Sequence, residues 1–352
     1  MSEIIISGWI LRGEELELIS GYVAVEGGVI KEVEEERAKG DFLIIPSLIN
    51  AHVHTGDSVA KDIEFENLME AVRPPDGLKH RILRETPREE IVEAMRRTCE
   101  DMKRCGISAF CDFREGGVEG VRMIKEASSG LLPVILGRPD GCTAEEVLKI
   151  SDGIGASGYL DVPRDSLEEW RDISEKMGKL FAIHAGEFSR DDIEGAISLE
   201  PDFIVHMTRA EREDLKRVRD LEIPLVVCPR ANLDGKGICG RFPPLREILE
   251  EGICVAAGTD NLMINGVDLF REMDFISRVY RIPPEDVIKM FTVNAARILG
   301  KEDELGWIER GKKAYITVIN LNSSNTCGTK SVLRTLVRRV RVDDIVKTIS
   351  GV

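Results

Sequence analysis

The residues best able to do chemistry in this chain are its histidines, which are few and regularly placed. The 352 residues include only five of them. His52 and His54 lie two positions apart in an apolar run with the character of a β-strand. Side chains on a strand alternate between its two faces, so both imidazoles must point the same way. Two imidazoles on one face are well placed to share a single metal ion.

Three more side chains suited to metal binding end other β-rich runs. His184 and His206 end the fifth and sixth of these runs, and Asp260 ends the eighth. Imidazole nitrogens and a carboxylate oxygen suit Zn²⁺ or Fe²⁺. An isolated strand histidine is usually a hydrogen-bonded core residue, but packing does not explain four of five histidines at or near strand ends. The pattern therefore predicts a metal site.

Glu187 is a further acidic side chain close in sequence to one of these residues. It follows His184 by three residues and lies just past the strand end. Taken alone, a solvated loop glutamate is the simpler interpretation. Beside a metal ligand, the carboxylate is well placed to move protons to and from a substrate, and we favour that role.

The elements that must position these residues alternate between strand-like and helix-like patterns. Repeated βα units of this number predict a (β/α)8 TIM-type barrel, whose active sites form at the carboxyl ends of the strands. An open doubly wound sheet is the alternative, but it normally has a glycine-rich phosphate loop after an early strand, and this sequence has none. The eight β-rich runs are 43–54, 107–113, 132–137, 154–160, 180–187, 202–207, 224–228 and 253–260.

Both ends of the chain differ from the alternating central part and are rich in strand-forming residues. Short β-rich runs fill the first 40 residues, and another follows the barrel segments. We expect the two ends to form a small β-sandwich-like domain together. The predicted division is 1–46 and 312–352 for this domain and 47–311 for the barrel.

Composition narrows the class of protein. Hydrophobic residues make up 43% and charged residues 32%, as in soluble globular proteins, and the formal charge is −15. A basic face for a nucleic-acid backbone is therefore not expected, although a nucleobase or nucleoside remains acceptable as a small substrate. We find neither an apolar run that would span a membrane nor a secretory signal. We expect a cytoplasmic protein with no membrane partner.

Substrate contacts are predicted from residues that follow the second and third runs. Phe113 could stack on a ring, and Arg114 could hold an oxo or carboxylate group, with Glu115 beside it at the barrel mouth. Arg138 follows the third run and offers the same chemistry. For these charged residues, an ordinary ion pair between loops is the alternative.

The segment 61–85 is long and contains the sequence Arg73-Pro-Pro-Asp-Gly. Its length suggests a loop over the active site. Lys79 and His80 are the substrate-contact candidates there, and a surface role is the alternative for both.

With these residues in place, the sequence resembles the amidohydrolase superfamily and, within it, the cytosine deaminase/chlorohydrolase branch. The resemblance covers nearly the whole chain and includes the tail segments 290–300 and 306–321. It depends on the combination of motifs rather than on any single one. The motifs are Pro46-Ser-Leu-Ile-Asn-Ala-His52-Val-His54, His184-Ala-Gly-Glu187, Ile204-Val-His206, Cys228-Pro-Arg-Ala-Asn232 and Gly258-Thr-Asp260-Asn261.

The resemblance implies a role for each site residue. Glu187 would move protons to the substrate ring nitrogen and the leaving group, and His206 would orient the attacking water or the substrate. Asp260 would also accept a proton from the attacking water. The implied ligands of one catalytic metal, Zn²⁺ with Fe²⁺ as the alternative, are His52, His54, His184 and Asp260. A homodimer is a further expectation from the family.

One departure from the family narrows the metal site. Dinuclear members bridge two metals with a carboxylated lysine on the fourth strand, and residues 153–161 contain no lysine. We therefore expect a single metal, which argues against amide hydrolysis of the dihydroorotase or urease type.

The leading functional hypothesis is a metal-dependent hydrolase that deaminates a nucleobase, nucleoside, pterin or related heterocycle through metal-activated hydroxide. Within the same class, the alternative is a hydrolase of a cyclic amide or of a halide-bearing ring. From another class, the alternative is a non-catalytic barrel that binds a ligand or partner. Retention of the whole ligand set together with Glu187 argues against that last hypothesis.

Overall fold

A parallel ring of strands forms the centre of the molecule. The computed structural model describes residues 3–233 and 242–351. Within them, the strands have the TIM-type barrel arrangement that the sequence predicted, each paired in parallel with its neighbour. In chain order they are β5 (Leu48–His54), β6 (Ile107–Arg114), β7 (Leu132–Gly137), β8 (Gly153–Ala156), β9 (Leu180–Ala185), β10 (Phe203–His206), β11 (Leu225–Val227), β12 (Val255–Ala257) and β13 (Asp260–Asn261).

The eighth position of the ring is divided between two short strands. β12 pairs with β11, and β13 pairs with β5, so the stretch 255–261 closes the ring. Gly258 and Thr259 connect the two strands, and the Thr259 amide donates to the His52 carbonyl at 3.1 Å. A Cβ atom at position 258 would lie 2.5 Å from the backbone nitrogen and oxygen of His52. The close approach therefore requires glycine.

A β-bulge in β5 decides which of its side chains face the inside of the ring. Ile49 and Ala51 belong to the same apolar cluster as Phe113, whose ring contacts residues of other strands across the interior. The register of β5 against β6 shifts after Asn50, and Val53 packs instead in the apolar cluster shared with the helices. Bulges of this kind redirect side chains near active sites. Beyond the shift, the even-numbered residues face inward.

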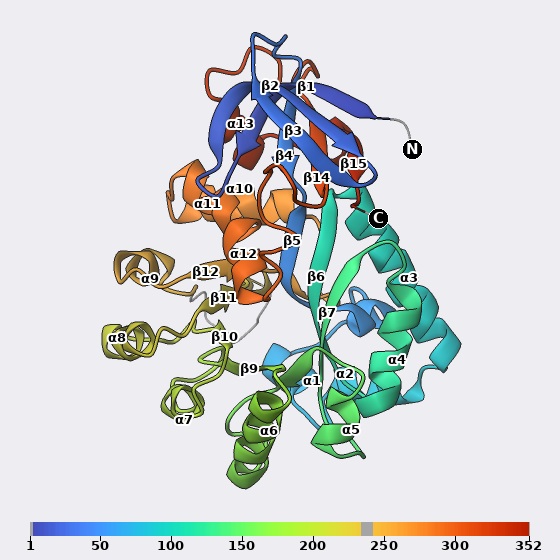
Figure 1. The fold of residues 1–352 in the computed structure, drawn as a ribbon. Helices are drawn as coiled ribbons and strands as arrows, with labels where there is room; N and C mark the ends of the chain where they lie inside the picture. The colour runs from blue at the N-terminus through green and yellow to red at the C-terminus, as the bar shows by residue number, and fades with distance from the viewer. Residues whose placement is uncertain (1–2, 234–241, 352) are drawn as a thin grey trace.

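Helices surround the ring on its outer side (Figure 1). Their apolar faces and the outward-facing strand residues form the largest buried cluster of the molecule. The helices between strands are α3 (Arg88–Arg104), α4 (Gly117–Ala127), α5 (Ala144–Leu148), α6 (Arg164–Lys176), α7 (Ile193–Ser198), α8 (Arg212–Asp220) and α9 (Leu245–Glu250). After the ring come α10 (Leu269–Val279), α11 (Pro284–Met290) and α12 (Val293–Ile298).

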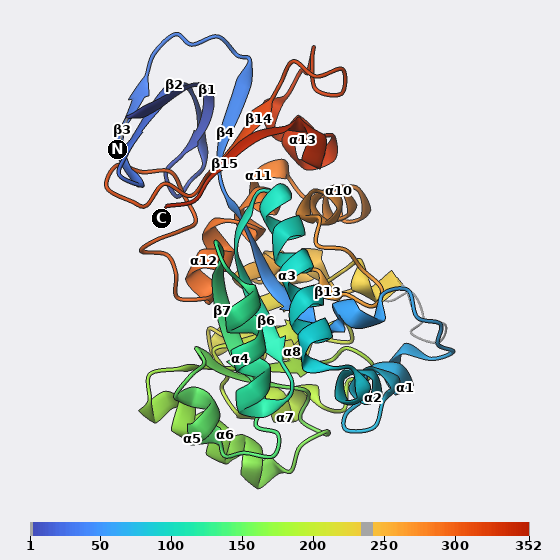
Figure 2. The same cartoon turned by 90° about the vertical axis from the view of Figure 1, so that its right-hand side faces the viewer.

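A segment between β5 and α3 extends the chain away from the helical layer. It contains the 3₁₀ helix η1 (Thr55–Ala60) and two short helices, α1 (Leu68–Val72) and α2 (Leu78–Glu85). Figure 2 shows α1 and α2 side by side, far from the sheet formed by the chain ends. The segment corresponds to the long loop predicted over the active site.

Strands from both chain ends form one six-stranded sheet, in the order β15-β14-β4-β1-β2-β3. The helix α13 (Val332–Arg338) lies between its two C-terminal strands. Among the residues that the structure describes, no helix is long and apolar enough to cross a bilayer. The strands are β1 (Ile4–Arg12), β2 (Glu17–Glu26), β3 (Val29–Glu35), β4 (Phe42–Pro46), β14 (Ile316–Asn320) and β15 (Ile345–Ile349).

The closing contact at Gly258 gives a test of the fold. Gly258→Ala is expected to lower the free energy of unfolding of the metal-free protein by about 1–3 kcal/mol, because the new methyl group meets backbone rather than a movable side chain. Gly266→Ala is the matched control, since a Cβ atom there meets nothing within 4 Å. Urea denaturation measures both variants. Equal midpoints for the two would contradict the tight closure.

Candidate metal centre

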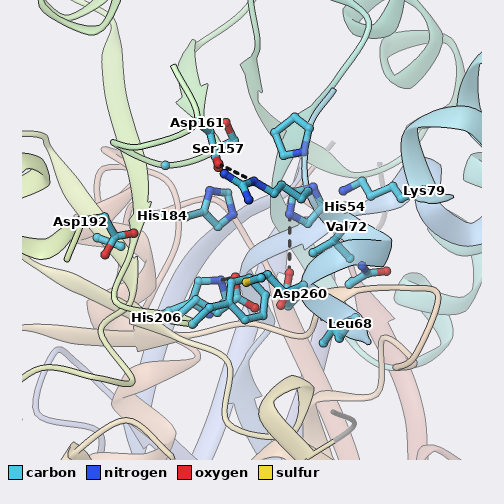
Figure 3. Close-up of a pocket in the computed structure, with 18 of the residues that line it drawn as sticks. His54, Leu68, Val72, Lys79, Ser157, Asp161, His184, Asp192, His206 and Asp260 are labelled. Atoms are coloured by element: carbon cyan, nitrogen blue, oxygen red, sulfur yellow. Dashed lines mark ion pairs between the residues drawn. The ribbon is translucent and has the colours of Figure 1, made fainter. Parts of the chain in front are cut away.

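Four histidines and one aspartate converge at the carboxyl ends of the strands. Figure 3 shows three of these histidines, His54, His184 and His206, together with Asp260. His52 and His54 come from β5, His184 from β9, His206 from the end of β10, and Asp260 from β13. All five are nearly or fully buried. The sequence therefore predicted which side chains gather at this end of the barrel.

The spacing of the nitrogen and oxygen atoms fits a small cation. The Nε2 atom of His52 lies 3.3 Å from Asp260 Oδ1 and 3.3 Å from His184 Nε2. His54 Nε2 lies 3.6 Å from the same Asp260 oxygen. Neighbouring ligands of a tetrahedral ion with bonds of about 2.0–2.1 Å are about 3.4 Å apart. These separations match the edges of such a coordination sphere.

Hydrogen bonds behind two of the imidazoles set their protonation. His54 Nδ1 lies 3.1 Å from the Phe113 carbonyl oxygen, and His184 Nδ1 lies 2.8 Å from that of Ala156. Because a carbonyl only accepts, each Nδ1 carries the proton and each Nε2 presents a lone pair to the centre. Lone pairs and a carboxylate that face one another fit a divalent metal ion.

Burial keeps these imidazoles neutral. It lowers the pKa of His54 to about 3 and that of His206 to about 4, and it also brings the pKa of His184 well below its ordinary value. Burial alone would raise the pKa of Asp260, but His52 and His206 outweigh it and hold that pKa below the usual range. At neutral pH His54, His184 and His206 therefore offer neutral nitrogen donors beside the negative charge of Asp260.

Glu187 lies on the cavity side of this group. Its Oε2 atom is 3.5 Å from His206 Nε2, and its side chain is 17% exposed. Burial and the negative charge of Asp260 raise the pKa of Glu187 well above its ordinary value. A carboxyl group that keeps its proton in this way is suited to donate it.

The cavity over the centre has a volume of about 270 Å³. Glu115, Arg138 and His80, which were predicted to contact substrate, line it together with residues of the centre. Several lining residues were not predicted, among them Ser157 and Asp192. Apolar side chains cover other parts of the wall: Leu68, Met69, Val72, Leu160, Phe188 and Ile264.

Phe113 and Arg114 do not line this cavity, which corrects the prediction that they contact substrate there. The Phe113 ring is buried inside the barrel, with its centre 4.5 Å from that of His52 and 4.9 Å from that of His184. It supports the imidazoles from below. Arg114 is also buried and donates from Nη2 to Glu115 Oε2 at 2.6 Å. Sequence position near the mouth did not reveal that both side chains are buried outside the cavity lining.

Two features of the mouth connect separate loops. Arg73, just after α1, lies 3.8 Å from Asp161 in the loop after β8, as measured from Nε to Oδ1. Deeper in, Lys79 on α2 contacts the carboxylates of Asp57 and Glu115. The sequence did not predict that Asp57 and Asp161 lie here, because a loop has no repeating pattern from which the direction of a side chain can be inferred.

Comparison with known proteins identifies relatives over most of the chain. A sequence model described as the Amidohydrolase family matches residues 43–350. An uncharacterized protein of Methanocaldococcus jannaschii is 37% identical in an alignment that covers 97% of this chain and 97% of that protein. A 5-methylthioadenosine/S-adenosylhomocysteine deaminase of Caldanaerobacter subterraneus is 26% identical over 96% of this chain and 88% of that protein.

Among solved structures, an adenosine deaminase from Xanthomonas campestris with bound zinc has a similar fold. The TM-score is 0.81, and the alignment covers 99% of this chain and 91% of that chain at 18% identity. At this identity the likeness concerns the fold alone. The individual roles of the residues in the centre stay predictions.

Metal addition tests the centre directly. Adding Zn²⁺ to the metal-free protein is expected to raise its Tm, since an ion at about 100 times its Kd stabilises the folded state by about 2.7 kcal/mol. His184→Ala should abolish this rise. His80→Ala is the control and should retain it, because the His80 ring contacts the Val72 carbonyl rather than the centre. A wild-type Tm that ignores zinc would contradict the assignment.

Proposed function

Because the chain belongs to the amidohydrolase family, we propose that it hydrolyses a C–N bond of a small heterocycle and releases ammonia. The observation that carries this proposal is Glu187, a largely buried carboxyl group with a raised pKa beside the converging imidazoles and Asp260. An amine leaves poorly unless it is protonated, so a deaminase needs a proton donor at this place. The chain is thus an amidohydrolase-type hydrolase with a site suited to deamination.

The proposed cofactor is one divalent ion, Zn²⁺ with Fe²⁺ as the alternative. Its ligands would be His52, His54, His184 and Asp260. The zinc in the Xanthomonas campestris structure supports the choice of metal, and the absence of lysine from residues 153–161 supports a single ion. When bound, the ion supplies Lewis acidity that makes water a nucleophile at neutral pH.

Three side chains of the chain would then manage protons. Asp260 accepts a proton from the attacking water, and His206 orients that water or the substrate. Glu187 would donate its proton to the ring nitrogen as the carbon is attacked, regain one from the new hydroxyl group as the carbonyl forms, and pass it to the amine as the C–N bond breaks. The proton held by Asp260 would then return Glu187 to its starting state. The two protons of the attacking water therefore end on the ring nitrogen and on the departing ammonia, and both pass through carboxyl groups already in place.

The proposed substrate is a nucleobase, nucleoside, pterin or related ring. The name of the Caldanaerobacter subterraneus relative makes adenine nucleosides with a sulfur substituent the first candidates. The apolar side chains along the wall, with Arg138 and Ser157 as polar contacts, suit a flat ring that carries a less polar extension. Hydrolysis of a cyclic amide or release of a halide is the alternative reaction at the same centre.

Further expectations concern the whole protein. Its partner would be the small substrate, with neither nucleic acid nor membrane bound, and it would act in the cytoplasm as a homodimer. The sheet formed by both ends would be a separate β-sandwich-like domain, because its strands enclose an apolar cluster of their own. The boundaries 1–46, 47–311 and 312–352 stay predictions, and residues 1–2 and 352 lie outside the described residues.

An ammonia-release screen tests the reaction. Zinc-loaded protein is expected to release ammonia from at least one member of a panel of adenine nucleosides, free nucleobases and pterins. Halide-bearing triazines and cyclic amides are included so that the alternative reactions can be recognised. Turnover only on those compounds would replace deamination by the alternative, and no turnover on the whole panel would contradict the proposal.

Glu187→Gln tests the proton donor. The substitution keeps the shape of the side chain and removes its acidity, so turnover is expected to fall about 10²–10⁴-fold while metal content is unchanged. Glu169→Gln, at an exposed position on α6, is the matched control and should keep wild-type turnover. Metal analysis and ammonia release are measured on the same preparations. Unchanged turnover in Glu187→Gln would remove this residue from its role.

A further inference from the structure

A group of buried charges lies beside the centre and is not used in the proposed reaction. Lys79 is 4% exposed, yet it comes from α2, in the segment that follows β5. Its Nζ atom lies 2.9 Å from Asp57 Oδ2 and 2.7 Å from Glu115 Oε1. Figure 3 shows Lys79 next to His54. Removing an ammonium group from water is costly, so this placement needs close negative partners, and two are present.

Glu115 connects this lysine to a candidate metal ligand. Its Oε1 atom, which contacts Lys79, is also 3.3 Å from His54 Nδ1. Its other oxygen accepts from Arg114 Nη2 at 2.6 Å. Both carboxylate oxygens are therefore held by positive groups, and the carboxylate is fixed against the rear nitrogen of the imidazole.

The position of Glu115 beside His54 is not explained by the need of His54 for a hydrogen-bond acceptor. The Phe113 carbonyl already lies 3.1 Å from His54 Nδ1 and serves as an acceptor. A carboxylate at the same nitrogen adds negative charge, which raises the basicity of Nε2 on the metal side of the ring. Lys79 Nζ lies 2.7 Å from one oxygen of Glu115 and Arg114 Nη2 lies 2.6 Å from the other, and two positive neighbours favour the ionised form. Glu115 therefore remains a carboxylate in this buried place.

We propose that Lys79 is a positioning residue for the metal centre: it holds Glu115 against His54 and thereby sets the orientation and strength of that ligand. This inference rests on the proposed metal site. It also connects the centre to the segment that covers the cavity, because α1 and α2 pack together and α1 contributes Leu68 and Val72 to the cavity wall. Lys79 acts through Glu115 and takes no part in the bond changes.

The first test compares metal affinity in two variants that each remove one partner of the network. Lys79→Met is expected to weaken Zn²⁺ binding about 10–100-fold, which is the usual effect of losing a group that orients a ligand. Asp57→Asn removes the other contact of Lys79 but keeps Lys79 on Glu115, so it should bind zinc within a few-fold of wild type. Competition with a chromophoric chelator measures the affinities without any assay of activity.

A double variant separates positioning from charge balance. Asp112 also belongs to this network, since its Oδ2 atom lies 3.8 Å from Arg114 Nη1. Asp57, Asp112 and Glu115 carry a formal charge of −3, and Lys79 and Arg114 carry +2, so the buried network has −1. Lys79→Met/Asp57→Asn also has −1, because one charge of each sign is removed. If Lys79 only balanced charge, the double variant would recover wild-type affinity; positioning predicts that it folds well but still binds zinc weakly.

The Co²⁺-substituted proteins give a spectroscopic readout, since the visible bands of the ion depend on its ligands and geometry. Altered bands are expected in Lys79→Met and in the double variant, and wild-type bands in Asp57→Asn. Wild-type affinity and bands in the double variant would overturn the inference while leaving the proposed function intact. A wild-type chain that binds neither ion would overturn both.

Discussion

The Nε2 atoms of His52 and His184 lie 3.3 Å apart in a part of the barrel where both rings are buried. Carbonyl acceptors hold the Nδ1 protons of His54 and His184, so the lone pairs of these rings can face only the centre and the Asp260 carboxylate. Donors collected in this way repel one another unless a cation lies between them. This convergence is the constraint around which the surrounding structure is arranged, and it connects the fold of the barrel to the proposed chemistry.

The backbone departs from regular strands at the places where it must aim these side chains. A bulge in β5 redirects its upper half, and the eighth position of the ring is split at Gly258. His206 and Asp260 have positive φ angles of 82° and 60°, which side chains other than glycine rarely adopt. Such strain persists only where the neighbouring structure enforces it, and it is common at functional sites. Both residues lie at strand ends that carry the centre.

Much of the barrel and the composition of the centre could be predicted from sequence, because both depend on local patterns. Alternation over two residues was enough to put His52 and His54 on one face. It could not show that this face is the inner one, since the same alternation continued from Ile49 and Ala51 would turn both imidazoles outward. Likewise, the sequence pattern predicts that Phe113 belongs to a strand. Its position next to the His52 and His184 rings depends on contacts between distant strands, which the pattern does not show. The buried network around Lys79 combines residues of η1, of α2 and of the end of β6, and the sequence of no single segment predicts it.

The groups around the centre are also arranged by hydrogen bonding and charge. The imidazole lone pairs face the centre and favour a cation there. Carbonyl groups and the Glu115 carboxylate, behind the rings, fix the direction of these lone pairs. The buried positive charges of Lys79 and Arg114 hold Glu115 in place. The most direct test of this account is anomalous X-ray diffraction at the zinc absorption edge from crystals of zinc-loaded protein. A single strong peak is expected at about 2.0–2.2 Å from the Nε2 atoms of His52, His54 and His184 and from the Asp260 carboxylate. The absence of a peak at this position, or a pair of peaks, would contradict it.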